Sequence, residues 1–161
     1  MYQGEELGLI DAVIPPDRIV DVDGRDGCRA PVPWTAAADH GWPHDPWLPF
    51  VVDADAGNVA TLREQPLSIL HLYRDLLRLR HHHAALQVGA FEMIDRDDDV
   101  LAYSRSTDGT TIIVALNLGV TPAELQSAAG QRVLMSTLPL DLTIPFDGTV
   151  APQSALICTS T

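Results

Sequence analysis

Residues 23–34 read DGRDGCRAPVPW, and this stretch sets the interpretation of the whole chain. It holds two glycines, two arginines four residues apart, and two prolines that lead into a tryptophan. Glycine permits backbone conformations that other residues avoid, and proline fixes φ, so the stretch predicts a long loop held in one shape. Long loops of defined shape usually serve a site.

Arg25 and Arg29 leave two interpretations of this loop open. A guanidinium is planar and permanently charged, so it can hydrogen-bond the hydroxyl groups of a polar ligand or pair with a carboxylate. In the second case ion pairs between the arginines and the loop's aspartates simply hold the loop together. The residues alone allow both.

Four stretches, taken in order, resemble the α-glucosidases of the α-amylase superfamily. They are MYQGEELGL at residues 1–9, GRDGCRAPVPW at 24–34, PWLP at 46–49 and SILHLYRDLLRLR at 68–80. The resemblance implies an α/β part followed by an all-β part. Residues 1–92 would hold the last strand, a long loop and the last helix of a (β/α)8 barrel, and residues 93–161 a small antiparallel β-sandwich. A complete barrel needs about 250 residues, so the 161 residues of the chain cannot hold one.

The same resemblance implies a function. Enzymes of this family are retaining glycosidases that release terminal α-linked glucose from oligosaccharides through a covalent glycosyl-enzyme, without a cofactor. Their nucleophile and general acid lie on earlier barrel strands, so the resemblance assigns no catalytic residue to this chain. We therefore expect the chain to be inactive alone and to bind an α-glucosidic oligosaccharide only together with the missing barrel portion.

Arg29 is the substrate-binding residue that the resemblance implies, because it matches the second arginine of the GRDGxR segment. It would orient the glucose at the non-reducing end, directly or through a carboxylate partner, with Arg25 and Asp26 as supports. Ala30 and Val32 depart from the threonine and methionine that are commoner in the family. The linkage preference is therefore left open.

A second hypothesis requires no chemistry. In this alternative the chain is a non-catalytic β-sandwich scaffold or a carbohydrate-binding module. An assay on a chromogenic α-glucoside separates an active enzyme from this alternative.

Glu5 and Glu6 form a carboxylate pair, which invites comparison with the two acids of a glycosidase. Adjacent residues on a strand or tight turn point to opposite sides, so they are poorly placed to flank one bond. We expect them instead to anchor the loop, by capping the following turn or by pairing with Arg25.

Two further patterns suggest a metal, and neither fits one. The aspartates near Asp21 fail the calcium-loop template, because Arg25 and Asp26 fall where an oxygen ligand and a glycine are required. Residues 81–83 are three histidines in a row, whose side chains point about 100° apart on a helix, so we expect a solvated helix end.

Residues 35–57 predict a continued loop with several prolines and aromatics. Trp34 and Trp47 could stack on the apolar face of a sugar, or could pin the loop to the barrel wall. The sequence favours the pinning role, because tryptophan is usually largely buried.

The regular elements come late in the chain. A helix is predicted from Pro66 to Arg80, with an apolar stripe at helical spacing. From about Val88 the period changes to that of strands, and a hairpin turn is predicted at residues 107–110. The predicted strands are residues 100–105, 111–118, 132–138 and 155–159.

Composition excludes some partners. A formal net charge of −12 argues against nucleic acid, and no apolar run is long enough to cross a membrane. The two cysteines, far apart in sequence, and the lack of a leader-like amino terminus predict a reducing, cytoplasmic location. Since one strand and one helix cannot close a barrel, we also expect self-association through exposed apolar surface.

Overall fold

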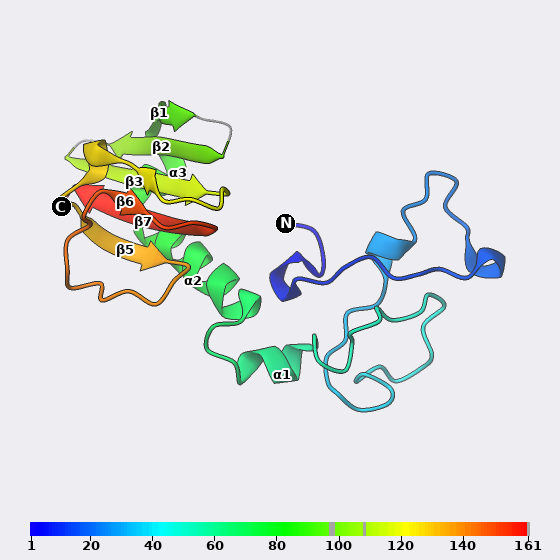
Figure 1. Ribbon diagram of the computed structural model, residues 1–161. Coiled ribbons are helices and arrows are strands. Elements are labelled where there is room, and N and C mark those ends of the chain that lie inside the picture. Colours follow the sequence, from blue (N-terminus) through cyan, green and yellow to red (C-terminus); the bar gives the residue numbers. More distant parts are fainter. Residues whose placement is uncertain (97–98, 108, 161) are drawn as a thin grey trace. The chain divides into compact units, whose positions relative to one another are not determined.

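The computed structural model describes residues 1–96, 99–107 and 109–160. The chain divides into two compact units, Met1–Leu77 and Arg78–Thr161. The first is called the loop unit and the second the sheet unit, and Figure 1 shows the contrast between them. The expected boundary between barrel and sandwich, at residues 92 and 93, concerns family domains rather than compactness, and it stays a prediction.

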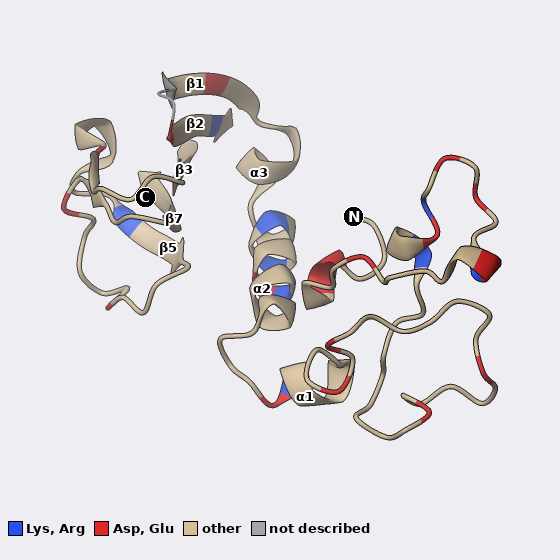
Figure 2. Ribbon diagram, turned by 45° about the vertical axis from the view of Figure 1, so that its right-hand side comes forward, with Lys and Arg blue, Asp and Glu red and all other residues tan. Residues whose placement is uncertain are grey.

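The loop unit contains very little regular structure. Its short 3-10 helices are η1 (Glu5–Leu7), η2 (Pro16–Arg18) and η3 (Gly27–Arg29), followed by α1 (Val59–Arg63) and the first part of α2 (Ile69–His82). Residues 1–89, all of which the structure describes, hold no strand. Acidic residues are spread along the loops of this unit (Figure 2).

The resemblance places the end of the last barrel strand at residues 2–6, but this segment is instead a turn followed by η1. Gly4 adopts a left-handed φ of 89°, and its carbonyl accepts hydrogen bonds from the amides of Leu7 (3.1 Å) and Leu9 (3.0 Å). A strand exists only where its backbone pairs with a neighbour, and here the nearby amides turn back on the segment itself. The prediction of a strand in this part of the chain is therefore wrong for this structure.

Small side chains make the core of the loop unit. One cluster joins Ala12, Ala30, Val51 and Ala54, and a second joins Leu7, Val59 and Leu62. The amide of Ala12 donates to the carbonyl of Gly27 (3.1 Å). A Cβ at position 27 would lie 2.9 Å from the Ala12 carbonyl oxygen, so this close approach requires glycine.

Both helices of this region differ in part from expectation. Helix α2 begins at Ile69 rather than at Pro66, because Ser68 is tied to the preceding turn through its hydroxyl, which donates to the Leu62 carbonyl (2.8 Å). Helix α1 was not predicted. It is a single turn capped by Asn58, whose side chain accepts from the Thr61 amide (2.9 Å), and so short a helix carries no periodic signal.

The sheet unit is built on an antiparallel sheet of strand order β1-β2-β3-β7-β5. The strands are β1 (Ala90–Arg96), β2 (Val100–Thr107), β3 (Thr110–Asn117), β5 (Arg132–Ser136) and β7 (Ser154–Ser160). The four predicted strands match β2, β3, β5 and β7, whereas β1 was not predicted. Thr107 pairs with Thr110, as the expected hairpin requires, and position 108 lies outside the described residues.

Both faces of this sheet are covered, but not as the predicted sandwich would cover them. On one face Ile112 and Ile157 pack with Ala85 of helix α3 (Ala84–Val88). On the other face Ile113 packs with Val150 under the short pair β4 (Ala123–Glu124) and β6 (Thr149–Val150) and the 3-10 helix η4 (Gln126–Ala128). A helix therefore stands on one side, and the second sheet is reduced to two strands of two residues.

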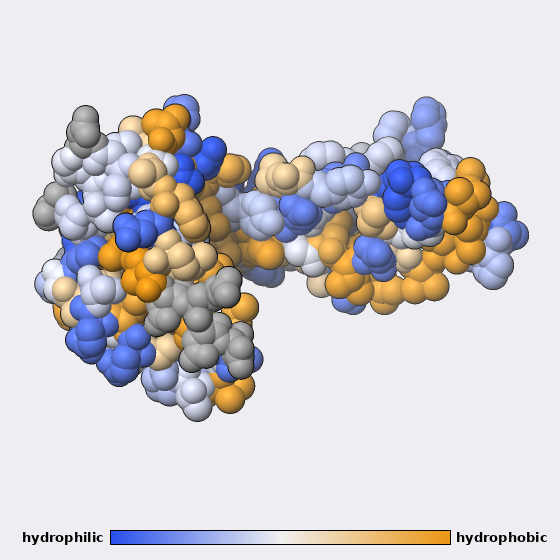
Figure 3. Space-filling model, turned by 90° about the horizontal axis from the view of Figure 1, so that it is seen from above, coloured by the Kyte–Doolittle hydropathy of each residue, from blue (hydrophilic) through white to orange (hydrophobic). Residues whose placement is uncertain are grey.

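Many apolar side chains are exposed on both units, and hydrophobic atoms are visible on the surface (Figure 3). Val22, Leu67 and Val120 are among the most exposed. Self-association through this surface stays a prediction.

Candidate functional site

One carboxylate joins the two arginines of the loop unit. Asp21 accepts hydrogen bonds from Nε (2.8 Å) and Nη2 (3.0 Å) of Arg25 and from Nη1 (2.5 Å) of Arg29. Arg25 also pairs with Asp23 (2.8 Å). The sequence analysis named both arginines but not Asp21 as their shared partner, although its spacing of four and eight residues from them was the signal available.

The surroundings of Asp21 keep its carboxylate ionised. Hydrogen bonds from the Arg25 guanidinium and the Asp23 amide lower its pKa from 3.8 to about 2, and the charge of Arg29 adds to this effect. The Asp21 side chain is only 7% exposed. An ionised and largely covered carboxylate therefore fixes the position of Arg29 at neutral pH.

Asp26 acts on the arginines indirectly, through the backbone that carries Asp21. Its side chain is buried, and Oδ2 accepts from the amides of Val20 (2.8 Å) and Asp21 (2.9 Å). It thus holds the turn that presents the Asp21 carboxylate. Arg25, by contrast, shares that carboxylate directly with Arg29.

Arg29 stands at the edge of a hollow in the loop unit. The hollow has a volume of about 390 Å³. It is lined by Gln3, Arg29, Pro31, Val32, Trp34, Trp42, Pro46, Trp47 and Leu48. A guanidinium and an amide thus stand beside three indole rings, a combination that can hold the hydroxyl groups and the apolar face of a sugar.

The tryptophans of the hollow divide into two kinds. Trp42 donates from Nε1 to the Val32 carbonyl (2.7 Å), and its ring meets Phe50 edge to face at 6.5 Å, so it pins the loop. Trp34 and Trp47, for which the sequence favoured pinning, are 50% and 58% exposed. Pinning of these two residues to the barrel wall stays a prediction.

The adjacent glutamates do not act as a pair. Glu6 accepts a hydrogen bond from the Gly4 amide (3.1 Å), which is the loop-anchoring role expected for it. The expected pairing with Arg25 is wrong, since that guanidinium binds Asp21 and Asp23 instead.

Three histidines follow one another at the end of α2. The ring centroids of His81 and His82 lie 6.1 Å apart, and Nδ1 of His82 lies 2.7 Å from the Arg78 carbonyl oxygen. Within the described part of the chain, no group of three His, Cys, Asp or Glu side chains could hold a metal ion. Nor does any described helix combine the length and apolar character needed to span a bilayer.

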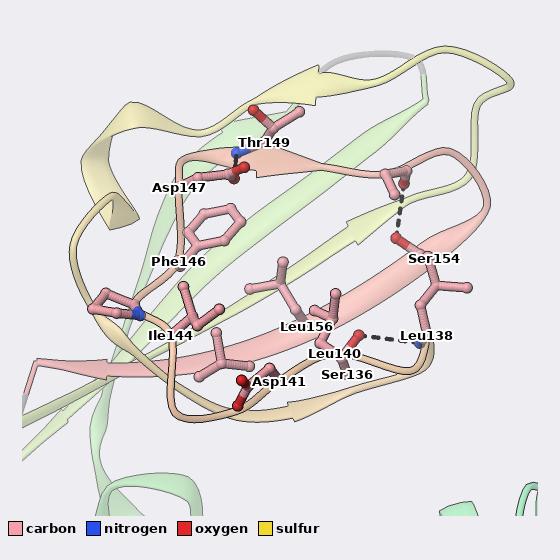
Figure 4. A pocket seen from close by; sticks show the side chains of 13 residues that line it. Ser136, Leu138, Leu140, Asp141, Ile144, Phe146, Asp147, Thr149, Ser154 and Leu156 are labelled. Carbon is pink, nitrogen blue, oxygen red and sulfur yellow. Dashed lines mark hydrogen bonds between the residues drawn. The ribbon is translucent and has the colours of Figure 1, made fainter.

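A second hollow, of about 220 Å³, lies in the sheet unit beside β5, β6 and β7 (Figure 4). Its walls are mainly apolar, with Phe146 and Leu156 among them. Its acids are engaged in local turns: Asp147 accepts from the Thr149 amide (2.8 Å), and hydrogen bonds from Thr143 lower the pKa of Asp141. The hollow beside Arg29 is therefore the better candidate for a polar ligand.

Comparison with known proteins gives a consistent family. The description "Alpha amylase, catalytic domain" matches residues 1–89. The chain is 32% identical over 128 residues to a probable alpha-glucosidase of Rhizobium meliloti, a match that covers 73% of this chain and 23% of that protein. It is also 32% identical over 139 residues to Maltase A1 of Drosophila melanogaster, covering 77% and 24% of the two chains.

The solved structures agree with this result. The crystal structure of the alpha-glucosyl transfer enzyme XgtA superposes with a TM-score of 0.82 at 30% identity, covering 100% of this chain and 32% of that one. The chain thus spans about a quarter of the curated relatives and about a third of this structure.

Proposed function

The chain belongs to the α-amylase family, and on that premise we propose that it forms part of a retaining α-glucosidase. The reaction is hydrolysis of terminal α-linked glucose from oligosaccharides through a covalent glycosyl-enzyme. One observation carries the proposal: the family's arginine, Arg29, is fixed by Asp21 at the edge of a tryptophan-lined hollow.

Arg29 is the residue that binds substrate in this proposal. A guanidinium has five N–H donors, and the hydrogen bond to Asp21 uses one of them. The others can hydrogen-bond the hydroxyl groups of the glucose at the non-reducing end. Because Asp21 holds the guanidinium in place, little rotational freedom is lost when the sugar binds.

The catalytic acids come from elsewhere in the barrel. The described residues that line the hollow include no Asp or Glu, and Glu6 is occupied by the Gly4 amide. A retaining mechanism needs two carboxyl groups about 5 Å apart across the scissile bond. The chain therefore contributes sugar binding, and the rest of the barrel contributes the chemistry.

A chimera tests this proposal. The matching segment of the Rhizobium meliloti relative is replaced by this chain, and release of nitrophenol from a chromogenic α-glucoside is measured for the chimera and for the 161-residue chain alone. We expect turnover by the chimera and none by the chain. Arg29→Lys in the chimera should lower kcat/KM by about 10- to 100-fold, since two well-placed donors to the sugar are worth about 1.5–3 kcal/mol.

Arg18→Ala is the matched control, because Arg18 is an exposed arginine in the same unit that does not line the hollow. Its kcat/KM should equal that of the unchanged chimera. Turnover by the chain alone that disappears in Glu5→Gln or Glu6→Gln would contradict the proposal. So would an active chimera that is indifferent to Arg29→Lys.

A further inference from the structure

Trp34 is an exposed side chain on an unusually well-held backbone. Its amide donates to the His40 carbonyl (2.9 Å), and its own carbonyl accepts from the Ala60 amide (3.0 Å). The carbonyl of Pro33 accepts from the Val59 amide (3.1 Å), so the start of α1 makes two hydrogen bonds to this segment. The backbone is therefore fixed, although the residue as a whole is 50% exposed.

The turn opposite Trp34 adds to this positioning. Gly41 adopts a φ of 78°, and a Cβ built there would lie 3.1 Å from Cβ of Trp34. Glycine lets the chain pass this close to the tryptophan.

Trp47 is 58% exposed although its neighbour in the sequence is buried. Leu48 is almost fully buried, and the ring of Pro46 restricts the backbone just before the tryptophan. Both Trp34 and Trp47 line the hollow of the loop unit together with Arg29.

We propose that Trp34 and Trp47 form a stacking platform for a second sugar ring of an α-linked gluco-oligosaccharide, next to the glucose bound by Arg29. This inference rests on the proposed function and adds the position of the neighbouring ring. The C–H face of a pyranose packs on an indole ring, and the hydroxyl groups around it need polar partners. Gln3 supplies one, because its amide nitrogen is held by the Ala30 carbonyl (2.9 Å) while the side-chain oxygen is an acceptor.

A protein segment fits the hollow less well than a sugar. Covering it with apolar side chains would remove water from the donors of Arg29 that Asp21 does not use, and unsatisfied buried donors are costly. A sugar hydroxyl satisfies them. The mixture of exposed tryptophans with one guanidinium and one amide thus favours a polyhydroxylated ring.

The indole N–H signals in NMR spectra test the platform directly. The chain has three tryptophans, so it gives three indole signals, which Trp34→Phe, Trp42→Phe and Trp47→Phe assign one by one. The full chain is titrated with maltotriose, and with mannitol as a hydroxylated control that has no ring. We expect saturable shifts for Trp34 and Trp47 with maltotriose only, and no matching shift for Trp42, whose N–H is bonded to Val32.

Variants sharpen this test. Trp34→Ala should weaken maltotriose binding by about 2- to 10-fold, the value of one aromatic contact, whereas Trp34→Phe should retain most of it. Unshifted signals at Trp34 and Trp47, or equal shifts at Trp42 and with mannitol, would overturn the platform. The platform would also be overturned if the Trp34 and Trp47 signals shifted only when the remaining barrel segment of a relative was added. The hollow would then be a surface that packs against the barrel.

The two proposals fail in different ways. If the activity of the chimera depends on Arg29 but the Trp34 and Trp47 signals do not shift with maltotriose, the platform is contradicted and the proposed function stands. If the tryptophan signals shift with maltotriose but Arg29→Lys leaves the activity of the chimera unchanged, the glucose site at Arg29 is contradicted and the platform stands.

Discussion

In the sheet unit Ile112 and Ile113 are neighbours on one strand and both are buried, whereas in the loop unit the most buried side chains include Asp26 and Asn58. Two adjacent buried isoleucines are explained by a sheet that is covered on both faces. Buried Asp and Asn are explained by a backbone with few regular hydrogen bonds, whose amides need side-chain partners. Both units have apolar clusters, but in the loop unit buried side chains such as Asp26 and Asn58 also accept hydrogen bonds from backbone amides that a sheet would pair with a neighbouring strand.

This contrast predicts that different substitutions damage the two units. Ile112→Ala should have the largest effect, because its side chain is fully buried between β3 and α3. Truncating a buried isoleucine removes apolar contacts and leaves a cavity, which costs about 2–5 kcal/mol of unfolding free energy. Urea unfolding of the full chain, followed by far-ultraviolet circular dichroism, measures the change.

Val120→Ala is the control for this substitution, since Val120 is exposed in the same unit. It should change the unfolding free energy by less than about 0.5 kcal/mol. Equal effects of the two substitutions would show that the sheet is not stabilised by packing on both faces.

Asp26→Ala tests the loop unit in the corresponding way. The substitution removes the shared acceptor of the Val20 and Asp21 amides and leaves two partly buried donors without it. We expect a local loss of about 1–3 kcal/mol, seen as faster hydrogen exchange at residues 20 and 21. The strands of the sheet unit should exchange at unchanged rates.

Asp23→Ala is the matched control, because the Asp23 side chain is 65% exposed. Its loss should leave the exchange of the Val20 and Asp21 amides nearly unchanged. Accelerated exchange across both units in Asp26→Ala would break the comparison, since it would mean that the units unfold together.

The sequence predicted the sheet unit better than the loop unit for a physical reason. Strands β2, β3, β5 and β7 contain runs of β-branched and apolar residues, and such runs are a local sequence signal for a strand. Strand β1 includes Glu92, Asp95 and Arg96 within seven residues, so its composition is not typical of a strand and the sequence did not predict it. Helix α3, which packs on one face of the sheet, was not predicted, because five residues are too few to show a helical period.

The candidate site shows the same limit. Arg25, Arg29 and Asp26 could be named from the segment in which they lie. Of the two interpretations of the arginines, the ion pairs with the loop's aspartates are present, and ligand contact stays a prediction for Arg29, which lines a hollow. The spacing of Asp21 from the arginines was a signal, but it could not single out this residue, because several aspartates lie within reach of the arginines in sequence. Only the folded loop selects one of them.

The smallest effect we predict concerns the charge of that selected carboxylate. The folded pKa of Asp21 is about 2, below the ordinary value of 3.8, because Arg25 and the Asp23 amide favour its ionised form. Its contribution to stability is therefore complete above about pH 4 and is lost as the pH falls from there toward 2. The contribution is modest, since both arginines are about half exposed and solvent screens their charges.

Titration of the carboxyl carbons by NMR checks this value, and Asp21→Asn supplies the comparison. In the unchanged chain the Arg25 Nε–H signal should move with the same midpoint near pH 2, because this group donates to the Asp21 carboxylate (2.8 Å). In Asp21→Asn that acid transition should disappear, while the sheet unit responds to acid as before. A midpoint near 4 would mean that the arginines do not hold this carboxylate in solution, and the positioning of Arg29 beside the hollow would then need another cause.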